Sequence, residues 1–153
     1  KLQRLAASPP SVALLPSGRL SGLVRYAREC TGPGDRLMTT WFVPQLFTFA
    51  SRGFAGGMVS FFGGHWSDTA FQQRVVSRLE EQSVPLVFIE KDTYGDFRRD
   101  FTLVDDYLNT NYQVAGESSF GDPYAAEDGY RVLSRNGVSP DRTYESWQLP
   151  CFQ

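Results

Sequence analysis

The stretch VPLVFI at residues 84–89 decides the fold class of this chain. A nearly continuous apolar run of this length is typical of a strand that is covered on both faces, as in a parallel sheet. Apolar residues recur at helical spacing on both sides of this run, at 68–81 and at 94–109. A buried strand between two amphipathic helices favours an α/β architecture.

The same criteria predict the other elements. Strands are expected at 35–43, 58–62, 112–115 and 130–134, and helices at 20–30 and 44–51. The alternation predicts a three-layer helix–sheet–helix sandwich around a mostly parallel sheet of about five strands. The last of these strands can be antiparallel, because no helix precedes it.

Composition fits one domain, because the chain has 153 residues of which 41% are hydrophobic. Prolines and serines gather in residues 1–18, which we interpret as a linker or leader, and residues 19–153 as a single soluble α/β domain. The net charge of -2 gives no reason to expect a nucleic-acid partner. No apolar run reaches the roughly 20 residues of a spanning helix, and a chain that starts at Lys1 is expected to be part of a longer protein.

Candidate ligand-binding residues gather around the segment GGHWSD at residues 63–68, which contains His65, Trp66 and Asp68. A histidine beside a serine and an aspartate is compatible with acyl transfer, but the chain has no G-x-S-x-G elbow. The alternative is structural: a strand end, a loop and a helix cap at Ser67 or Asp68. In an α/β sheet such a loop can lie at the carboxyl ends of strands, where ligands bind. Arg52 completes this candidate set.

No cofactor or metal site is predicted. The glycines at 53–64 match neither a dinucleotide fingerprint nor a phosphate-binding loop. Carboxylates are frequent between residues 90 and 128, but Asp105 and Asp106 diverge by about 100° around a helix and no EF-hand spacing occurs. We therefore predict no catalytic residue in this chain and interpret the carboxylates as a solvated face.

Two cysteines, Cys30 and Cys151, leave two interpretations open. They are too few for a zinc site built on paired cysteines. They can be separate thiols, or they can form one disulfide that joins the start of the domain to its end and that requires an oxidising compartment.

Several short motifs together resemble a known family. They are CTGPGDR (30–36), TWFVP (40–44), RGFAGG (52–57), FFGGHWSD (61–68), VPLV (84–87), FGDP (120–123) and WQLPCF (147–152). The set resembles the C-terminal soluble region of bacterial multi-pass membrane glycosyltransferases of the dolichyl-phosphate-mannose–protein mannosyltransferase (GT-C-like) type. The resemblance covers about residues 18–153.

The resemblance implies a place and a partner. It puts the chain on the periplasmic side of the bacterial inner membrane, attached to the membrane-embedded part of the same polypeptide. The catalytic carboxylate of such enzymes lies in an early loop outside this chain, and the substrates are a polyprenyl-phosphate-linked sugar and an acceptor. An oxidising periplasm also favours the disulfide between Cys30 and Cys151.

We therefore expect a non-catalytic extracytoplasmic domain that covers the active site or positions an acceptor or partner. The alternative is a carbohydrate- or small-ligand-binding module that uses Arg52, His65, Trp66 and Asp68. A third hypothesis, a stand-alone hydrolase, requires His65 to meet a serine and an aspartate within hydrogen-bond reach.

Overall fold

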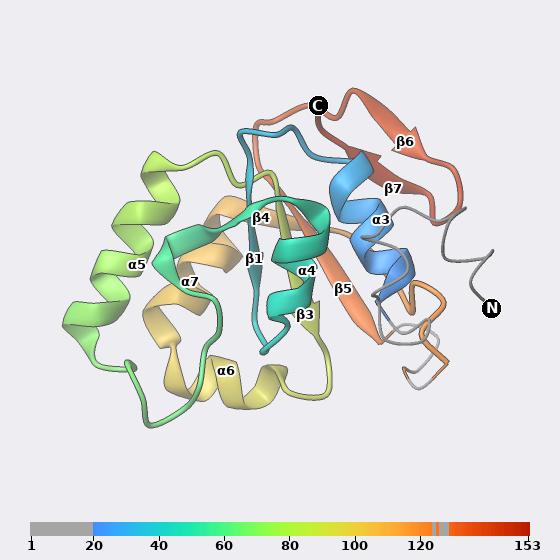
Figure 1. Ribbon diagram of the computed structural model, residues 1–153. Coiled ribbons are helices and arrows are strands. Elements are labelled where there is room, and N and C mark those ends of the chain that lie inside the picture. Colours follow the sequence, from blue (N-terminus) through green and yellow to red (C-terminus); the bar gives the residue numbers. More distant parts are fainter. Residues whose placement is uncertain (1–19, 124, 126–128) are drawn as a thin grey trace.

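The computed structural model describes residues 20–123, 125 and 129–153, and it confirms the α/β sandwich (Figure 1). The predicted linker at 1–18 lies outside the described residues. In chain order the elements are α3 (Ser21–Glu29), β1 (Arg36–Thr39), α4 (Pro44–Ala50), β2 (Gly53–Phe54), η1 (Ala55–Gly57), α5 (Thr69–Glu81), β3 (Leu86–Glu90), α6 (Tyr94–Asp100), α7 (Thr102–Asn111), β4 (Tyr112–Ser118), β5 (Tyr130–Arg135), β6 (Arg142–Tyr144) and β7 (Leu149–Cys151).

The main sheet has five strands in the order β2-β1-β3-β5-β4. Strand β1 pairs in parallel with β2 and with β3. Strand β5 pairs antiparallel with β3 and with β4, so it runs against the other four strands. This confirms the mostly parallel sheet and the antiparallel strand predicted at 130–134.

Strand β3 shows how the three layers arise. Successive side chains of a strand point to opposite faces. Leu86 and Phe88 join a core cluster with α3 and α4, whereas Val87 and Ile89 join a cluster with α5, α6 and α7. In Figure 1, α5 and α7 lie to the left of the strands and α3 lies to their right. All four side chains are buried, as the apolar run predicted.

The structure corrects the strand predicted at 58–62. The edge strand is β2, a two-residue segment that precedes η1, and residues 58–62 pair with no strand among the described residues. Gly56 and Gly57 have φ of 65° and 75°, a left-handed backbone that glycine adopts readily. The turn that they make directs the following chain away from the ladder of β1.

The helix predicted at 94–109 is two helices. Phe101, with φ -124° and ψ 52°, separates α6 from α7. Its fully buried ring packs edge-on against Phe61 and stacks on Phe97, with ring centroids at 5.0 Å and 5.6 Å. The apolar spacing of this segment predicts one helix, but the burial of the Phe101 ring interrupts it between α6 and α7.

The C-terminal segment, which we did not predict to be ordered in strands, forms the hairpin of β6 and β7. None of the helices formed by the described residues has the length and apolar character needed to cross a membrane.

Candidate functional site

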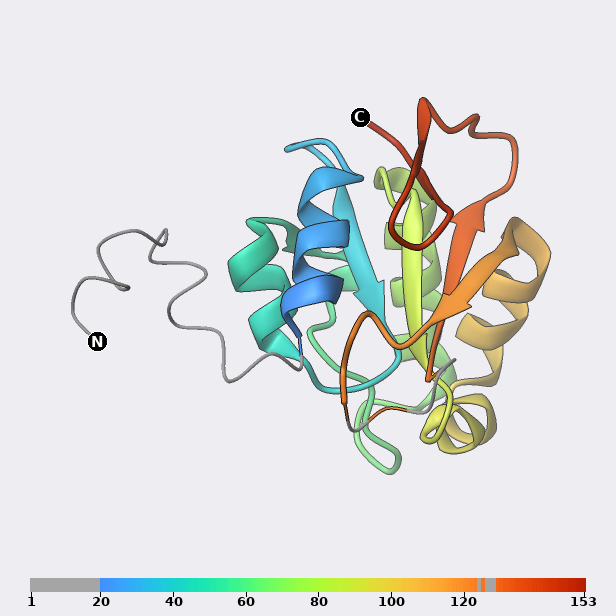
Figure 2. The same cartoon turned by 90° about the vertical axis from the view of Figure 1, so that its right-hand side faces the viewer.

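The connections after β1 and β3 leave the sheet toward opposite faces. Strand β1 leads to α4 on one layer, and β3, its neighbour, leads to α6 on the other. Such a switch in direction opens a crevice outside the carboxyl ends of two parallel strands, and ligands of α/β proteins bind there. In Figure 2 this is the lower edge of the sheet, where β1 ends.

Two adjoining hollows occupy this edge, and we call them together the switch-point crevice. One has a volume of about 300 Å³ and lies between the segment after β1 (Thr40–Phe42), the segment 61–63 and the start of α6. The other has a volume of about 360 Å³ and extends toward Leu20 and β5. Trp41, Phe42 and Glu90 line both hollows.

Aromatic side chains form the wall of the crevice. The rings of Phe42 and Phe62 lie 5.8 Å apart with a tilt of 42°, and they are 56% and 54% exposed. Trp41 stacks on Tyr130 at 5.4 Å, which fixes its ring between the crevice and the core. Large exposed apolar surface in a concave site is typical of ligand binding.

The described polar side chains that line the crevice are acidic or neutral. Glu90 Oε2 accepts a hydrogen bond from the Thr93 hydroxyl at 3.0 Å. Tyr130 donates to Asp122 Oδ2, also at 3.0 Å. Thr40 is buried, and its Oγ1 has no hydrogen-bond partner among the described residues. A buried hydroxyl without a partner is uncommon, so its presence in the lining points to a missing partner.

Among the described residues that line the two hollows there is no lysine, arginine or histidine. Lys91, which follows Glu90 in the chain, forms an ion pair with Glu117 at 2.9 Å. Arg131 pairs with the same carboxylate at 2.8 Å. Hydrogen bonds from these two cations lower the pKa of Glu117 below its ordinary value.

Arg52 is held by the protein at the opposite edge of the sheet, beside the first residue of β2. All five of its N–H groups donate: to the Thr31 hydroxyl and to the carbonyls of Arg28, Thr31, Ala50 and Ser51. The guanidinium therefore joins the ends of α3 and α4 and has no N–H left for a ligand.

His65, Trp66 and Asp68 lie in the loop that leads from the crevice to α5. Trp66 is 67% exposed with φ 57°, and its ring packs on Phe71 at 5.8 Å. Asp68 caps α5, because its Oδ1 accepts from the Phe71 N–H at 2.9 Å. The structure thus keeps these three residues near one another, away from Arg52, and none of them lines either hollow. Their role in ligand binding stays a prediction.

Sequence reasoning missed Thr40, Phe42, Phe62 and Glu90. A signal was present, because the motifs TWF and FFGG each put aromatic residues directly after an apolar segment. We assigned Thr40, Phe42 and Phe62 to strands, which end earlier or do not form, and we assigned Glu90 to a solvated acidic face.

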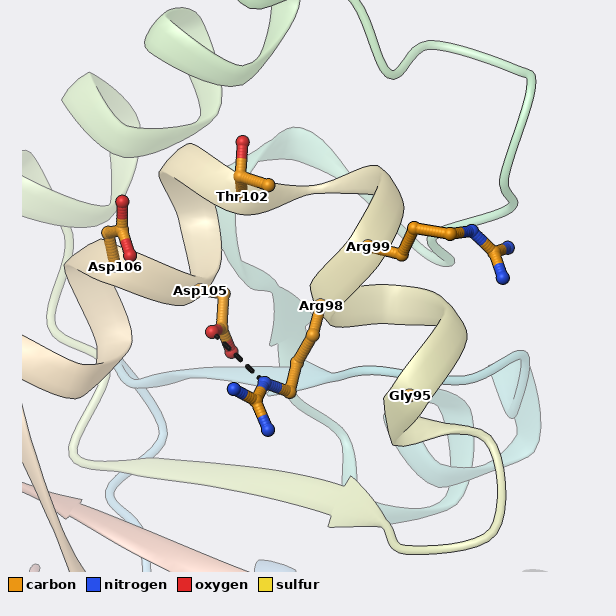
Figure 3. A pocket seen from close by; sticks show the side chains of 6 residues that line it. All are labelled: Gly95, Arg98, Arg99, Thr102, Asp105 and Asp106. Carbon is orange, nitrogen blue, oxygen red and sulfur yellow. Dashed lines mark ion pairs between the residues drawn. The ribbon is translucent and has the colours of Figure 1, made fainter.

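A third hollow, of about 400 Å³, lies outside α6 and α7 (Figure 3). Arg98 faces Asp105 across it at 3.6 Å, whereas Arg99 extends to the other side. Asp105 also accepts from the Tyr94 hydroxyl at 2.5 Å and from Asn109 at 3.0 Å. Burial and this carboxylate raise the pKa of Tyr94. Asp105 therefore connects α7 to α6 through Arg98 and Tyr94, and this hollow is the outer surface of that connection.

Cys30 and Cys151 form a disulfide, with Cα atoms 4.1 Å apart. It lies at the edge of the sheet opposite the crevice, where the Phe152 N–H donates to the Cys30 carbonyl at 2.8 Å. Tyr26 donates to the Pro150 carbonyl at 2.6 Å in the same region. The disulfide interpretation is confirmed, and it indicates an oxidising environment.

Among the residues that the structure describes, no group of three or more histidines, cysteines or carboxylates has the geometry to hold a metal ion. Comparison of the chain with family models, with curated proteins and with solved structures gives no significant match. The fold defines it as an α/β protein, and the crevice at the switch point of its sheet is the candidate site.

Proposed function

We propose that this chain is a non-catalytic extracytoplasmic domain of a membrane glycosyltransferase that uses a polyprenyl-phosphate-linked sugar, and that it positions the acceptor. The observation that carries the proposal is the switch-point crevice, with exposed Phe42 and Phe62 and the carboxylate of Glu90 in one concavity. The resemblance of the motifs supports the enzyme class.

The compartment is supported by the disulfide between Cys30 and Cys151, since disulfides persist in oxidising compartments such as the periplasm. The partner is the membrane-embedded part of the same polypeptide. Leu20, the first described residue, lines the crevice. The described domain thus begins beside the crevice, which supports a crevice that faces the membrane-embedded part of the polypeptide.

A carbohydrate-binding module without a transferase is the second candidate, and the exposed pair of rings favours it. A stand-alone hydrolase has less support. It requires hydrogen bonds from His65 to a serine and an aspartate, and the imidazole of His65 makes none with the described residues.

Two assays test the proposal. In membranes that contain the full-length polypeptide, we expect Phe62→Ala to lower transfer of labelled sugar from polyprenyl phosphate to endogenous acceptors at least five-fold. Phe54→Ala is the matched control, because Phe54 is also exposed (40%) but lies outside the crevice. Equal transfer by the two variants would contradict the positioning role.

The second assay examines the 153-residue chain alone with hexose 1-phosphates and p-nitrophenyl hexosides. We expect no turnover, because catalysis is assigned to another part of the polypeptide. Turnover that is lost in His65→Ala or Asp68→Asn would refute the non-catalytic assignment.

A further inference from the structure

We propose that the switch-point crevice binds a neutral hexose unit and discriminates against a sugar phosphate. The inference rests on the proposed function and deepens it, because it assigns the crevice to the acceptor and not to the lipid-linked donor. It depends on three properties of the crevice: its exposed rings, its hydrogen-bond acceptors and its charge.

The rings of Phe42 and Phe62 offer a stacking surface. A pyranose has one face rich in C–H groups, and this face is apolar enough to pack on an aromatic ring. The two rings are tilted by 42° with centroids at 5.8 Å, so together they form a shallow angle and not one flat plane. Each is more than half exposed, so a sugar laid on them would remove apolar surface from water.

Hydroxyl groups of a sugar would find acceptors beside these rings. The carboxylate of Glu90 can only accept hydrogen bonds, and its Oε2 receives the Thr93 hydroxyl while Oε1 has no partner among the described residues. Hydrogen bonds from hydroxyls to a carboxylate are short and strong. The buried Thr40 hydroxyl, which also lacks a partner there, lines the same hollow.

The negative charge of the crevice distinguishes the two substrates of the proposed reaction, the neutral acceptor and the phosphate-bearing donor. Glu90, Asp96 and Asp122 line the crevice, and none of its described lining residues is a lysine, arginine or histidine. Protein sites for phosphate use arginine, lysine or clustered backbone N–H groups. A phosphate held here would face carboxylates, and like charges brought together weaken binding. A neutral hexose meets no such repulsion.

The experiment titrates the ¹⁵N-labelled 153-residue chain with methyl α-glucopyranoside, methyl α-mannopyranoside and methyl α-galactopyranoside, and with the three matching hexose 1-phosphates. We expect at least one neutral glycoside to shift the backbone amide signals of Thr40, Phe62 and Glu90. The matching 1-phosphate should bind at least ten-fold more weakly at low salt.

Three variants locate the binding. Phe62→Ala should raise the dissociation constant of the neutral glycoside at least ten-fold, and Phe54→Ala should leave it unchanged. Glu90→Gln should weaken the neutral glycoside and also reduce the preference over the 1-phosphate. Phe62 is largely exposed, and a thermal melt checks that its variant is folded.

The inference is overturned if a 1-phosphate binds as tightly as its glycoside, if no neutral glycoside binds at 100 mM, or if the shifts fall outside the crevice. A failure of this inference can be distinguished from a failure of the proposed function. Tight phosphate binding would assign the crevice to the donor and refute acceptor positioning, but it would leave the assignment to a non-catalytic glycosyltransferase domain in place. Neutral binding, combined with unchanged transfer by Phe62→Ala in membranes, would retain the inference and remove the glycosyltransferase role.

Discussion

At the scale of single residues, Gly22 packs directly against the backbone of another segment. It lies on α3, and a β-carbon added there would overlap the backbone carbonyl oxygen of Phe120 and approach the Trp147 ring at 3.1 Å. A backbone carbonyl cannot rotate away as a side chain can. The absence of a side chain at this position therefore lets α3 lie directly against the segment after β4.

We expect Gly22→Ala to lower the free energy of unfolding by about 1–3 kcal/mol, because overpacked core positions have costs of this size. Gly95→Ala is the matched control, since a β-carbon at Gly95, also in a helix, meets no atom within 4 Å. That variant should be unchanged or up to about 1 kcal/mol more stable. Urea unfolding of the three proteins measures the difference, and equal losses for both variants would contradict the packing argument.

Residue chemistry gave only part of the site in advance. The capping role of Asp68 could be predicted, because a cap depends on a local sequence pattern. Arg52 was placed in a ligand site, yet it donates all its hydrogen bonds within the protein. A guanidinium suits backbone carbonyls as well as anionic ligands, so its sequence position alone could not distinguish the two. Likewise Phe42 and Phe62 are brought together only by tertiary packing.

At the scale of elements, strands β4 and β5 are joined at one end by a charged group. Glu117 on β4 accepts from Arg131 on β5 and from Lys91, which follows β3. Both hydrogen bonds favour the ionised carboxylate, so the pKa of Glu117 is lower in the folded protein than in the unfolded chain. A lowered folded pKa adds stability above the unfolded pKa, and this contribution is lost as the pH falls through the folded pKa.

At pH 7 we expect Glu117→Gln to be less stable than the wild type by about 0.2–1 kcal/mol, the range of partly exposed ion pairs. The gap should stay constant down to about pH 5 and shrink at lower pH, where the carboxylate of the wild type becomes protonated. Chemical unfolding at a series of pH values measures this gap. It should also narrow in about 1 M salt, which screens the pair; a gap that widens on acidification would exclude this account.

Element types were predictable where a segment is buried on both faces or amphipathic, as in β3 and α5. The predicted boundaries of elements were wrong where one tertiary contact overrides the local sequence pattern. Phe101 interrupts a helical spacing because its ring is buried against Phe61. Residues 58–62 have strand composition, yet Gly56 and Gly57 turn the chain before it can pair with β1.

At the scale of the whole molecule, the disulfide closes a loop of 121 positions around almost the entire domain. Replacing both Cys30 and Cys151 by serine should lower the free energy of unfolding by about 4–5 kcal/mol on the chain-entropy account. The wild type in excess reductant should unfold at the same midpoint as the double variant. Mass spectrometry after alkylation provides the check: two thiols that react in the native, unreduced protein would exclude the bridge.

The architecture could be predicted because alternation of buried strands with amphipathic helices leaves few arrangements. The hairpin of β6 and β7 could not, since its strands have three residues each and carry little periodicity. The crevice depends on the order of the strands in the sheet, and local sequence patterns do not predict that order. Only the sequence of sheet neighbours, β2-β1-β3, determines that the loops after β1 and β3 separate.

The position of the disulfide also determines how the domain carries mechanical tension. The shortest covalent path from Leu20 to the chain end runs along α3 to Cys30, across the sulfur atoms to Cys151, and then through Phe152. Every strand of the main sheet lies within the closed loop and outside this path. A pull on the two ends of the domain would therefore load one helix and one sulfur–sulfur bond, and would leave the strands of the main sheet unstretched.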